Sequence, residues 1–355
     1  MKRSDFKKIN HNLFTVDYEE YDTEYANKFS LELLKTACSS CRKGNFYGRN
    51  LDLAYADSSE IVVRTTGTSK RYATVGIISG VPFFTEDGIN EGFIDEVYEL
   101  IPVLICDGIN EKGLVCNVNV VHLTNGQKET TGTNPGKDKL NMQAICRVIL
   151  DNCASVDEAV ALIKDRDVCT MFDFSQLNRE GYEFHYMIAD KEKTVVIEFV
   201  NNEVVVLDDH RIMTNFYLSK KRDIAGNGYE RYQALYDNYD KIDSVDSMMD
   251  AMAKVAYSKG NDVHNEYFAV SDQFNMKAPD GNVVTLDNYE QYIDFIYEKG
   301  ERDRLGTIEA MKTKSNPKSY WITMHTSVYD LDKRCLYVSI HENYAERFRF
   351  ELISK

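Results

Sequence analysis

The sequence predicts an α+β fold built as an αββα sandwich, in which two stacked antiparallel sheets carry helices on both outer faces. Segments rich in Val, Ile, Tyr and Phe have the composition of strands. Other segments carry apolar residues at helical spacing. Strands come first, followed by a helix pair, more strands, more helices and a last set of strands. This order differs from the alternating βαβ series of parallel sheets.

The expected elements follow the chain in that order. A short amphipathic helix is predicted at 29–35, and Ser155 is a candidate N-cap for the helix that follows it. Residues 265–319 have the loop signals of an insertion, around 279–281 and 315–317. Strands are predicted at 46–53, 60–66, 72–80, 101–106, 114–121, 184–190, 194–200, 203–208, 320–328, 335–341 and 345–352. Further helices are predicted at 139–151, 156–164, 229–239, 245–258, 288–298 and 307–313.

Charge and hydropathy argue against several classes of protein. The net charge of −15 makes a nucleic-acid partner unlikely, because phosphate binding needs clustered Lys and Arg. No apolar run reaches the length of about 18 residues typical of a transmembrane helix. The N-terminus is basic but has no apolar segment of a secretory signal behind it. We therefore expect a cytoplasmic protein, while secretion stays open if a signal has been removed.

The cysteines are expected to be reduced and buried. Most of them lie in apolar surroundings, and they are few for the chain length, so free thiols are favoured over a set of disulfides. The pair Cys38-x-x-Cys41 also suggests a zinc or thiol-redox site, but the histidines are scattered singly and offer no second ligand pair. No metal and no organic cofactor is predicted. The eight cysteines lie at positions 38, 41, 106, 116, 146, 153, 169 and 335.

The stretch from Cys38 to Asp52 predicts a hairpin that brings a thiol beside a guanidinium. A two-residue loop at 43–44 sets Cys38 opposite Arg49, and a loop at 44–45 sets it opposite Leu51. In either register Cys38 and Arg49 share a face of the ribbon, because side chains alternate along a strand.

This hairpin favours Cys38 as a covalent catalyst. A guanidinium stabilises a nearby thiolate, so the pKa of Cys38 is expected to be lowered. Cys41 is the competing nucleophile, but it has the opposite parity and is expected to face away from Arg49.

Several short stretches form an ordered set of motifs from residue 38 to the end of the chain. They are Gly48-Arg49-Asn50-Leu51-Asp52, Asp107-Gly-Ile-Asn-Glu-Lys-Gly-Leu114, the segment from His185 to Glu198, Met213-Thr-Asn215, Tyr329-Asp-Leu-Asp332 and Glu342-Asn343. In this order they resemble the choloylglycine hydrolases, N-terminal-nucleophile enzymes that include bile salt hydrolases and penicillin V acylases. The resemblance implies one N-terminal-nucleophile hydrolase domain at 38–355.

The resemblance also implies that residues 1–37 are a leader whose removal makes Cys38 the first residue. Its free α-amino group would then serve as the general base, since an α-amine titrates near pH 8. An intact Ala37–Cys38 amide has no such base. The alternative is a leader that stays attached and packs as an N-terminal helix.

The family motifs assign further roles around the thiol. Arg49 would stabilise and orient it, and a surface ion pair is the alternative for this residue. Asp52 would hold the α-amine; alternation places it on the face opposite Arg49, so the strand is expected to end or bulge near Leu51. The alternative for Asp52 is a turn cap. Asn119 would donate to the oxyanion, with Asn117 on the same face as the alternative.

Two more residues come from the second half of the chain. Asn215 matches an amide that donates to the developing oxyanion, with a turn asparagine as the alternative. Arg231 resembles an arginine near the nucleophile, with a helix-surface arginine as the alternative. His185 and His325 lie in predicted strands and are expected to be packed residues, because this chemistry needs no catalytic histidine.

The function implied is hydrolysis of a linear, non-peptide amide with a hydrophobic acyl group by a self-processing cysteine hydrolase. Conjugated bile acids, penicillin V, acyl homoserine lactones and N-acyl lipid amides are the substrates considered. One alternative is an acyltransferase that passes the acyl thioester to an amine, and another is a non-catalytic binding protein with a retained leader. A small-molecule amide is the expected partner, and the resemblance suggests a homodimer or homotetramer.

Overall fold

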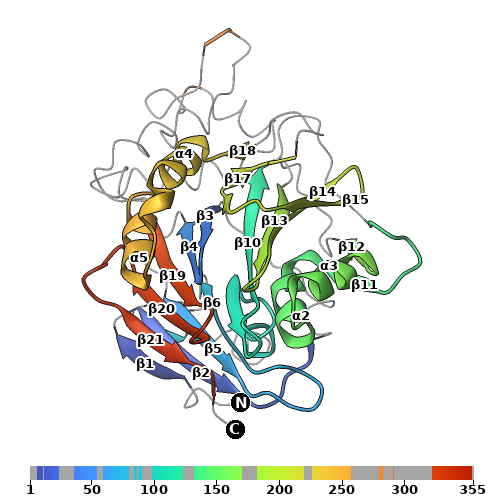
Figure 1. The fold of residues 1–355 in the computed structure, drawn as a ribbon, viewed down its shortest axis with the longest axis horizontal. Coiled ribbons are helices and arrows are strands. Elements are labelled where there is room, and N and C mark those ends of the chain that lie inside the picture. The colour runs from blue at the N-terminus through green and yellow to red at the C-terminus, as the bar shows by residue number, and fades with distance from the viewer. Residues whose placement is uncertain are drawn as a thin grey trace.

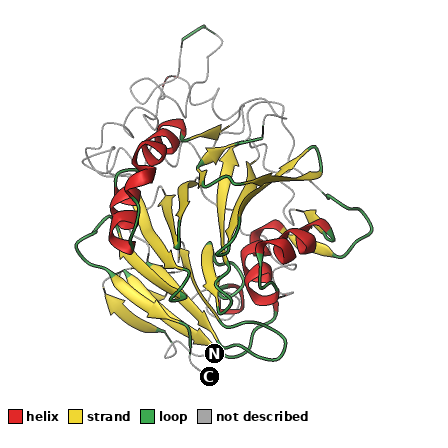
Figure 2. Cartoon of the chain, in the orientation of Figure 1, coloured by secondary structure: helices red, strands yellow, loops and turns green. Residues whose placement is uncertain are grey.

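The protein consists of two large sheets with helices outside them (Figures 1 and 2). The structure is a computed structural model, and all structural statements below refer to the residues that it describes. These are 6–10, 12–23, 36–53, 59–79, 84–85, 88–89, 98–122, 132–169, 182–219, 226–256, 280–282, 291 and 322–353. The helices predicted at 29–35, 288–298 and 307–313 and the insertion loops of 265–319, apart from residues 280–282 and 291, lie outside the described residues.

The larger sheet, called the nine-stranded sheet below, runs from the N-terminal strands to the middle of the chain. Its apolar strands are buried on both faces, as expected of a layer that lies between a second sheet and helices. In spatial order it consists of β1 (Lys7–Asn10), β2 (Leu13–Tyr18), β5 (Glu60–Thr65), β6 (Thr74–Ser79), β9 (Asp107–Asn110), β10 (Val115–His122), β13 (Tyr182–Ala189), β14 (Thr194–Val200) and β15 (Glu203–Asp208).

The smaller sheet, called the six-stranded sheet, contains the hairpin that carries Cys38, and both strands of this hairpin are inner strands of the sheet. In spatial order it consists of β16 (Ile212–Met213), β3 (Thr36–Lys43), β4 (Phe46–Leu53), β19 (Ile322–Asp330), β20 (Cys335–Ile340) and β21 (Phe348–Glu351). Three further strand pairs are β7 (Phe84–Thr85) with β8 (Gly88–Ile89), β11 (Lys139–Asn141) with β12 (Asp167–Cys169), and β17 (Asn215–Phe216) with β18 (Gly226–Asn227).

The helices cover the two outer faces and so complete an αββα sandwich. α2 (Ile145–Asn152) and α3 (Val156–Lys164) contact the nine-stranded sheet, and α4 (Tyr229–Asn238) and α5 (Val245–Ala253) contact the six-stranded sheet. The two sheets contact each other through β3 and β10 and through β20 with β6 and β9. Separate apolar clusters fill the three interfaces between the layers. The predicted layer order is therefore observed.

The structure corrects three details of the predicted elements. Residues 101–106 form turns rather than a strand, although the apolar side chains of this run are buried. The helix predicted at 139–151 begins only at Ile145, because residues 139–141 form β11 and residues 142–144 a 3-10 turn. The nine-stranded sheet is not wholly antiparallel, since β2 and β5 pair in parallel.

Part of the predicted leader belongs to the nine-stranded sheet. β1 and β2 form its edge, and Leu13, Phe14 and Val16 are buried in the core. Within the described part of residues 1–37, the segments 7–10 and 13–18 are strands, and the helix expected at 29–35 lies outside the described residues. Removal of the leader stays a prediction, and its consequence for these strands is taken up below.

The β3–β4 hairpin adopts the second of the two predicted registers. The loop is Gly44–Asn45, with Gly44 at a φ of 57°, and Cys38 lies opposite Leu51. The side chains of Cys38, Ser40 and Arg42 point between the sheets. Cys41 points the other way, into the apolar cluster that joins this sheet to α4 and α5, as its parity predicts.

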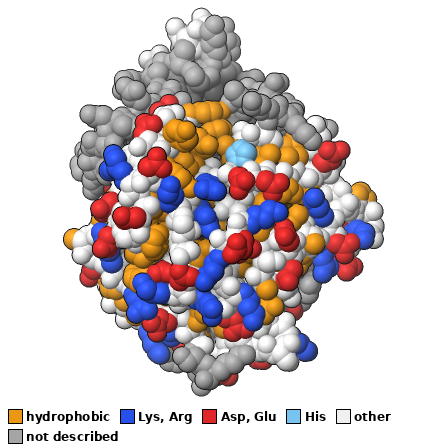
Figure 3. Space-filling model, viewed as in Figure 1, with side chains coloured by type: hydrophobic (Ala, Val, Ile, Leu, Met, Phe, Trp, Pro, Cys, Tyr) orange, Lys and Arg blue, Asp and Glu red, His pale blue; other side chains and the backbone are white. Residues whose placement is uncertain are grey.

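The surface carries charges of both signs, and the cysteines are free thiols. Figure 3 shows acidic and basic side chains interspersed over the described part of one face. All eight cysteines are free. Within the described segments, none of the helices has the length and hydropathy required to span a membrane.

Two glycines provide a test of the packing between layers. A Cβ at Gly76 on β6 would lie 2.6 Å from the main-chain oxygen of Asp107, which cannot move without disrupting the sheet. A Cβ at Gly48 on β4 would lie 2.7 Å from Sδ of Met248, a flexible side chain. We expect Gly76→Ala to lower the free energy of unfolding by about 1–3 kcal/mol. Gly48→Ala is the matched control, with a smaller loss expected in urea denaturation; equal losses would contradict this account.

Candidate active site

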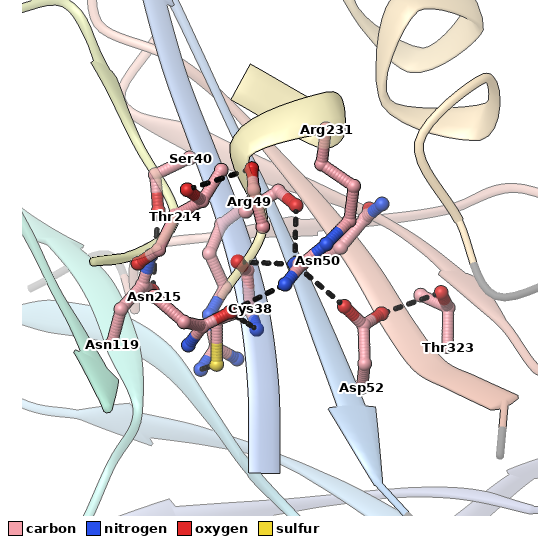
Figure 4. Close-up of polar contacts among 12 residues, drawn as sticks. Cys38, Ser40, Arg49, Asn50, Asp52, Asn119, Thr214, Asn215, Arg231 and Thr323 are labelled. Atoms are coloured by element: carbon pink, nitrogen blue, oxygen red, sulfur yellow. Dashed lines mark hydrogen bonds and ion pairs between the residues drawn. The ribbon is translucent and has the colours of Figure 1, made fainter. Parts of the chain in front are cut away.

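Cys38 lies on β3 between the two sheets, with its sulfur beside a buried guanidinium (Figure 4). Nη2 of Arg49 on β4 is 3.4 Å from Sγ of Cys38 and donates to the main-chain oxygen of Val118 at 3.2 Å. Cys38 and Arg49 are each only 1% exposed. The shared face predicted from strand alternation is therefore observed, and the surface ion pair considered for Arg49 is excluded.

Burial, not the guanidinium, dominates the electrostatics of the thiol. Burial raises the pKa of Cys38, and Arg49 and Arg231 offset only part of this rise. The expectation of a lowered pKa is therefore wrong for the uncleaved chain, because no water solvates the thiolate. Burial also raises the pKa of Cys41, to about 12, and this thiol has no arginine partner.

Arg231 on α4 holds the main chain of the nucleophile. Its Nη1 donates to the main-chain oxygen of Cys38 at 2.6 Å and to Oγ of Ser39 at 2.9 Å, and lies 3.4 Å from Oδ2 of Asp52. Its Nη2 donates to Oδ1 of Asn215 at 2.7 Å. Arg231 is 2% exposed, so the helix-surface alternative is wrong.

Asn215 on β17 binds the nitrogen of the predicted scissile amide. Its Oδ1 accepts from the main-chain N–H of Cys38 at 2.8 Å, and its Nδ2 donates to the main-chain oxygen of Val120 at 2.7 Å. The residue is fully buried in a strand, which excludes the turn-asparagine alternative. In the uncleaved chain its amide NH2 is thus engaged with the main chain.

Asn119 on β10 approaches the same region from the nine-stranded sheet. Its Nδ2 donates to the main-chain oxygens of Met213 and Thr214, at 3.3 and 3.1 Å. Its Oδ1 accepts from Nδ2 of Asn117 at 2.8 Å and from Oγ of Ser40 at 3.3 Å. Asn119 therefore lies beside the segment that leads into Asn215. Asn117, two residues earlier on β10, holds the side chain of Asn119 through its hydrogen bond to Oδ1.

Asp52 lies on the helix-facing side of the β3–β4 ribbon, opposite to Arg49. It accepts from Oγ1 of Thr323 at 2.6 Å and reaches Cys38 only through Arg231 (Figure 4). Burial raises its pKa to about 6 against the opposing effect of Arg231. The expected end or bulge near Leu51 is found in part: β4 continues to Leu53, and the register irregularity opposite Leu51 and Asp52 lies on the partner strand β19, between Thr323 and His325.

A buried ionic cluster behind Arg49 was missed by the sequence analysis. Nη1 of Arg49 is 3.1 Å from Oδ2 of Asp107 on β9 and 3.0 Å from Nε2 of His325 on β19. Nδ1 of His325 contacts a carboxylate oxygen of Glu60 on β5. We call these four residues the interlayer cluster. The available signal was a charged or imidazole side chain within an otherwise apolar strand, as in Glu60-Ile-Val-Val.

Hydrogen bonds fix the orientation of Asp107 within this cluster. Its Oδ1 accepts from Oγ of Ser327 at 2.8 Å and from the hydroxyl of Tyr329. Burial alone would raise the pKa of Asp107, but Arg49 and His325 hold it below its usual value. Among the described residues, no group of His, Cys, Asp and Glu is arranged to hold a metal ion.

Comparisons with known proteins bear on the family of this chain. A family model described as linear amide C–N hydrolases, choloylglycine hydrolase family, matches residues 37–264. A penicillin V acylase from Pectobacterium atrosepticum is 28% identical over 112 residues, or 31% of this chain and 29% of that protein. The match to this curated relative thus spans less than a third of its length.

The solved structures that match this chain include a bile acid hydrolase and a penicillin V acylase. A variant of the conjugated bile acid hydrolase from Clostridium perfringens is 15% identical, with a TM-score of 0.49 over 89% of this chain and 92% of that one. The penicillin V acylase from Agrobacterium tumefaciens is 14% identical, with a TM-score of 0.40 over 89% of this chain and 86% of that one. Because the family model covers well over half of the sequence, the chain belongs to the choloylglycine hydrolase family of linear amide C–N hydrolases.

Proposed function

We propose that the chain is the precursor of a cysteine hydrolase that cleaves linear, non-peptide amides with a hydrophobic acyl group. One observation carries the proposal: the sulfur of Cys38 faces Arg49, while Asn215 and Arg231 hold its main-chain nitrogen and oxygen. The family description supplies the linear amide bond, and the penicillin V acylase relative supports an acyl group of this kind.

The first step is release of the leader at the Ala37–Cys38 bond. Sγ of Cys38 attacks the carbonyl carbon of Ala37, an S–C bond forms, and the C–N bond breaks as the thiol proton passes to the nitrogen. Water then hydrolyses the thioester, which frees the carboxylate of Ala37 and regenerates the thiol. Cys38 becomes the first residue of the mature chain.

Substrate turnover repeats this chemistry with an external amide. The freed α-amine of Cys38 takes the thiol proton as the sulfur attacks, and then protonates the leaving amine. Arg49 stabilises the developing thiolate. Asn119 and Asn215 are the proposed oxyanion donors, and such a donor contributes about 2.7–4 kcal/mol in other hydrolases.

The hydrogen bonds of the uncleaved chain support an inactive precursor. Nδ2 of Asn119 donates to two main-chain oxygens and Nδ2 of Asn215 donates to one, so both N–H donors of Asn119 and one of the two donors of Asn215 are engaged in the uncleaved chain. The thiol is buried and its pKa is raised. Cleavage replaces the amide nitrogen of Cys38 with an amine, which changes the partner of Oδ1 of Asn215 and gives the thiol a base.

Arg231 and Asp52 are proposed to fix the main chain of residue 38 once the leader bond is broken. Arg231 binds the main-chain oxygen of Cys38, and Asp52 anchors the same guanidinium from the other side. In the uncleaved chain Asp52 is the cross-strand partner of Ala37, so its carboxylate lies next to the cleavage site. After cleavage the new ammonium group would offer it a second cationic partner.

The nucleophile is tested by Cys38→Ser, with Cys41→Ser as the matched control on the same strand. We expect the Cys38 variant to keep its full mass and to lose roughly 10³-fold or more of its amide hydrolysis. Cys41→Ser should process and turn over substrate, because its side chain faces the helices. Intact-mass spectrometry and a panel of conjugated bile acids, penicillin V and N-acyl amides measure both. An active Cys38→Ser with an inactive Cys41→Ser would disprove the assignment.

The leader is expected to remain bound after cleavage, because β1 and β2 are part of the nine-stranded sheet. The mature protein should therefore run as two fragments, 1–37 and 38–355, under denaturing conditions. The fragments should elute together in native gel filtration. Val16→Asp places a charge in the core at β2 and should release the leader fragment, since an unpaired buried charge is costly. Separation of the unsubstituted fragments would contradict this view.

The raised pKa of Asp52 makes a pH prediction for the uncleaved Cys38→Ala chain. Asp52 ionises at about pH 6 when folded and near 3.8 when unfolded, so folding takes up a proton between these values. Its contribution to stability is thus complete below about pH 4 and is lost as the pH rises through 6.

Adding Asp52→Asn should remove this loss. The unfolding free energy of the Asn variant, relative to its Cys38→Ala parent, should rise between about pH 4 and pH 7 by up to about 3 kcal/mol. Loss of the Arg231 contact adds an offset that does not depend on pH. Urea denaturation across this range measures the difference, and a flat difference would show that Asp52 titrates alike in both states.

A further inference from the structure

The residue that the proposed mechanism leaves unused is His325, which lies fully buried in the interlayer cluster. We propose that His325 is a positioning residue: it holds the guanidinium of Arg49 so that Nη2 faces the sulfur of Cys38, and Glu60 fixes the tautomer that makes this possible. The inference rests on the proposed role of Cys38 as nucleophile.

The tautomer of His325 follows from its two neighbours. A guanidinium is always a donor, so Nε2 of His325, at 3.0 Å from Nη1 of Arg49, accepts a hydrogen bond and carries no proton. The proton of the neutral ring is then on Nδ1, which donates to the carboxylate of Glu60. The three side chains form a line from β5 through β19 to β4.

His325 supplies a contact that Arg49 cannot obtain elsewhere. Among the described atoms, Nε of Arg49 is buried without a hydrogen-bond partner, so the two terminal nitrogens alone set the plane of the guanidinium. Nη1 contacts Asp107 through one oxygen, Oδ2, which fixes a distance but leaves rotation free. The second contact of Nη1, with His325, restricts that rotation together with the hydrogen bond from Nη2 to the main-chain oxygen of Val118. Nη2 is then directed to Sγ of Cys38 and to the main-chain oxygen of Val118.

The arrangement holds only while His325 is neutral. The charged groups that face the ring are Glu60 from β5, Asp107 from β9 and Arg49 from β4. Burial lowers the pKa of His325, but Glu60 and Asp107 favour the imidazolium more strongly and place its pKa above the usual value. Protonation turns Nε2 into a donor that faces a cation. The ring would then turn to Oδ2 of Asp107, now 3.4 Å away, and Arg49 would lose its second contact.

The test compares two substitutions of His325. Gln carries an acceptor for Arg49 and a donor for Glu60 but does not titrate, whereas Leu carries neither. The readout is the rate at which iodoacetamide alkylates Cys38 in the full chain at a series of pH values, measured on the Cys38 peptide by mass spectrometry. We expect His325→Leu to raise the apparent pKa of Cys38 by about one unit, which slows alkylation about tenfold at a fixed pH. His325→Gln should be alkylated at a rate within about threefold of that of the unsubstituted chain. The part of the pH profile that depends on the titration of His325 should disappear.

Asp151→Asn is the control for a merely structural effect. Asp151 is also a buried carboxylate paired with an arginine, Arg147 at 3.2 Å, but it lies on α2 away from Cys38. We expect it to lower the melting temperature without changing the alkylation profile of Cys38. Equal profiles for His325→Leu, His325→Gln and the unsubstituted chain would overturn the proposal, as would equal shifts for Leu and Gln.

A second variant decides the matter if His325→Leu does not fold. Glu60→Leu keeps the ring but removes the acceptor of its Nδ1–H, so the ring proton is expected on Nε2, facing Asp107, and Arg49 loses its second contact. A raised apparent pKa of Cys38 is again expected, and an unchanged one would overturn the proposal. Alkylation needs no amide substrate. A chain that hydrolyses no amide but shows these shifts would therefore refute the proposed function. It would still support the role of His325 in orienting Arg49.

Discussion

The structure depends on a fully buried guanidinium between two sheets. Arg49 joins the thiol on β3 to a carboxylate on β9, so one side chain links the six-stranded sheet to the nine-stranded sheet. A buried charge without its partner costs about 3–5 kcal/mol, whereas the intact pair is close to neutral. The pairing therefore acts less as a source of stability than as a constraint. Any sliding of the sheets that separates Arg49 from Asp107 is strongly disfavoured, and the same constraint fixes the place of Cys38.

The two faces of the β3–β4 ribbon contact different groups of the candidate site. Between the sheets lie Arg49, which contacts the sulfur, and Asn119, the proposed oxyanion donor. On the helix side lie the groups that hold the main chain, namely Arg231 and Asp52. Strand alternation produces this division directly, since Arg49 and Asp52 differ in parity. The thiol is thus contacted from between the sheets, while the main chain of Cys38 is held from the helix side.

Local rules predicted the parts of this arrangement that depend on neighbouring residues. Alternation placed Cys38 and Arg49 on one face, and glycine tolerance limited the hairpin to two registers. Tertiary partners decided the rest. The parallel pairing of β2 with β5 joins segments that are separated in the chain by the β3–β4 hairpin of the other sheet, and no local pattern reports it. Residues 101–106 have the apolar composition of a strand. Burial of apolar side chains does not supply a neighbouring strand for main-chain hydrogen bonds. The partnership of His325 with Glu60 exists only once the sheets have stacked.

Burial and the proposed nucleophilic role oppose each other at Cys38, and the proposed cleavage of the leader would resolve this opposition. A thiol enclosed by two sheets is protected from solvent but is hard to ionise, as the raised pKa of Cys38 reflects. Moving its proton to an adjacent amine avoids the need for a solvated thiolate. Only the cut at Ala37–Cys38 creates that amine, at a nitrogen that Asn215 already binds. Because β1 and β2 remain part of a sheet, the cut can create the base without dismantling the layer that keeps Arg49 in place.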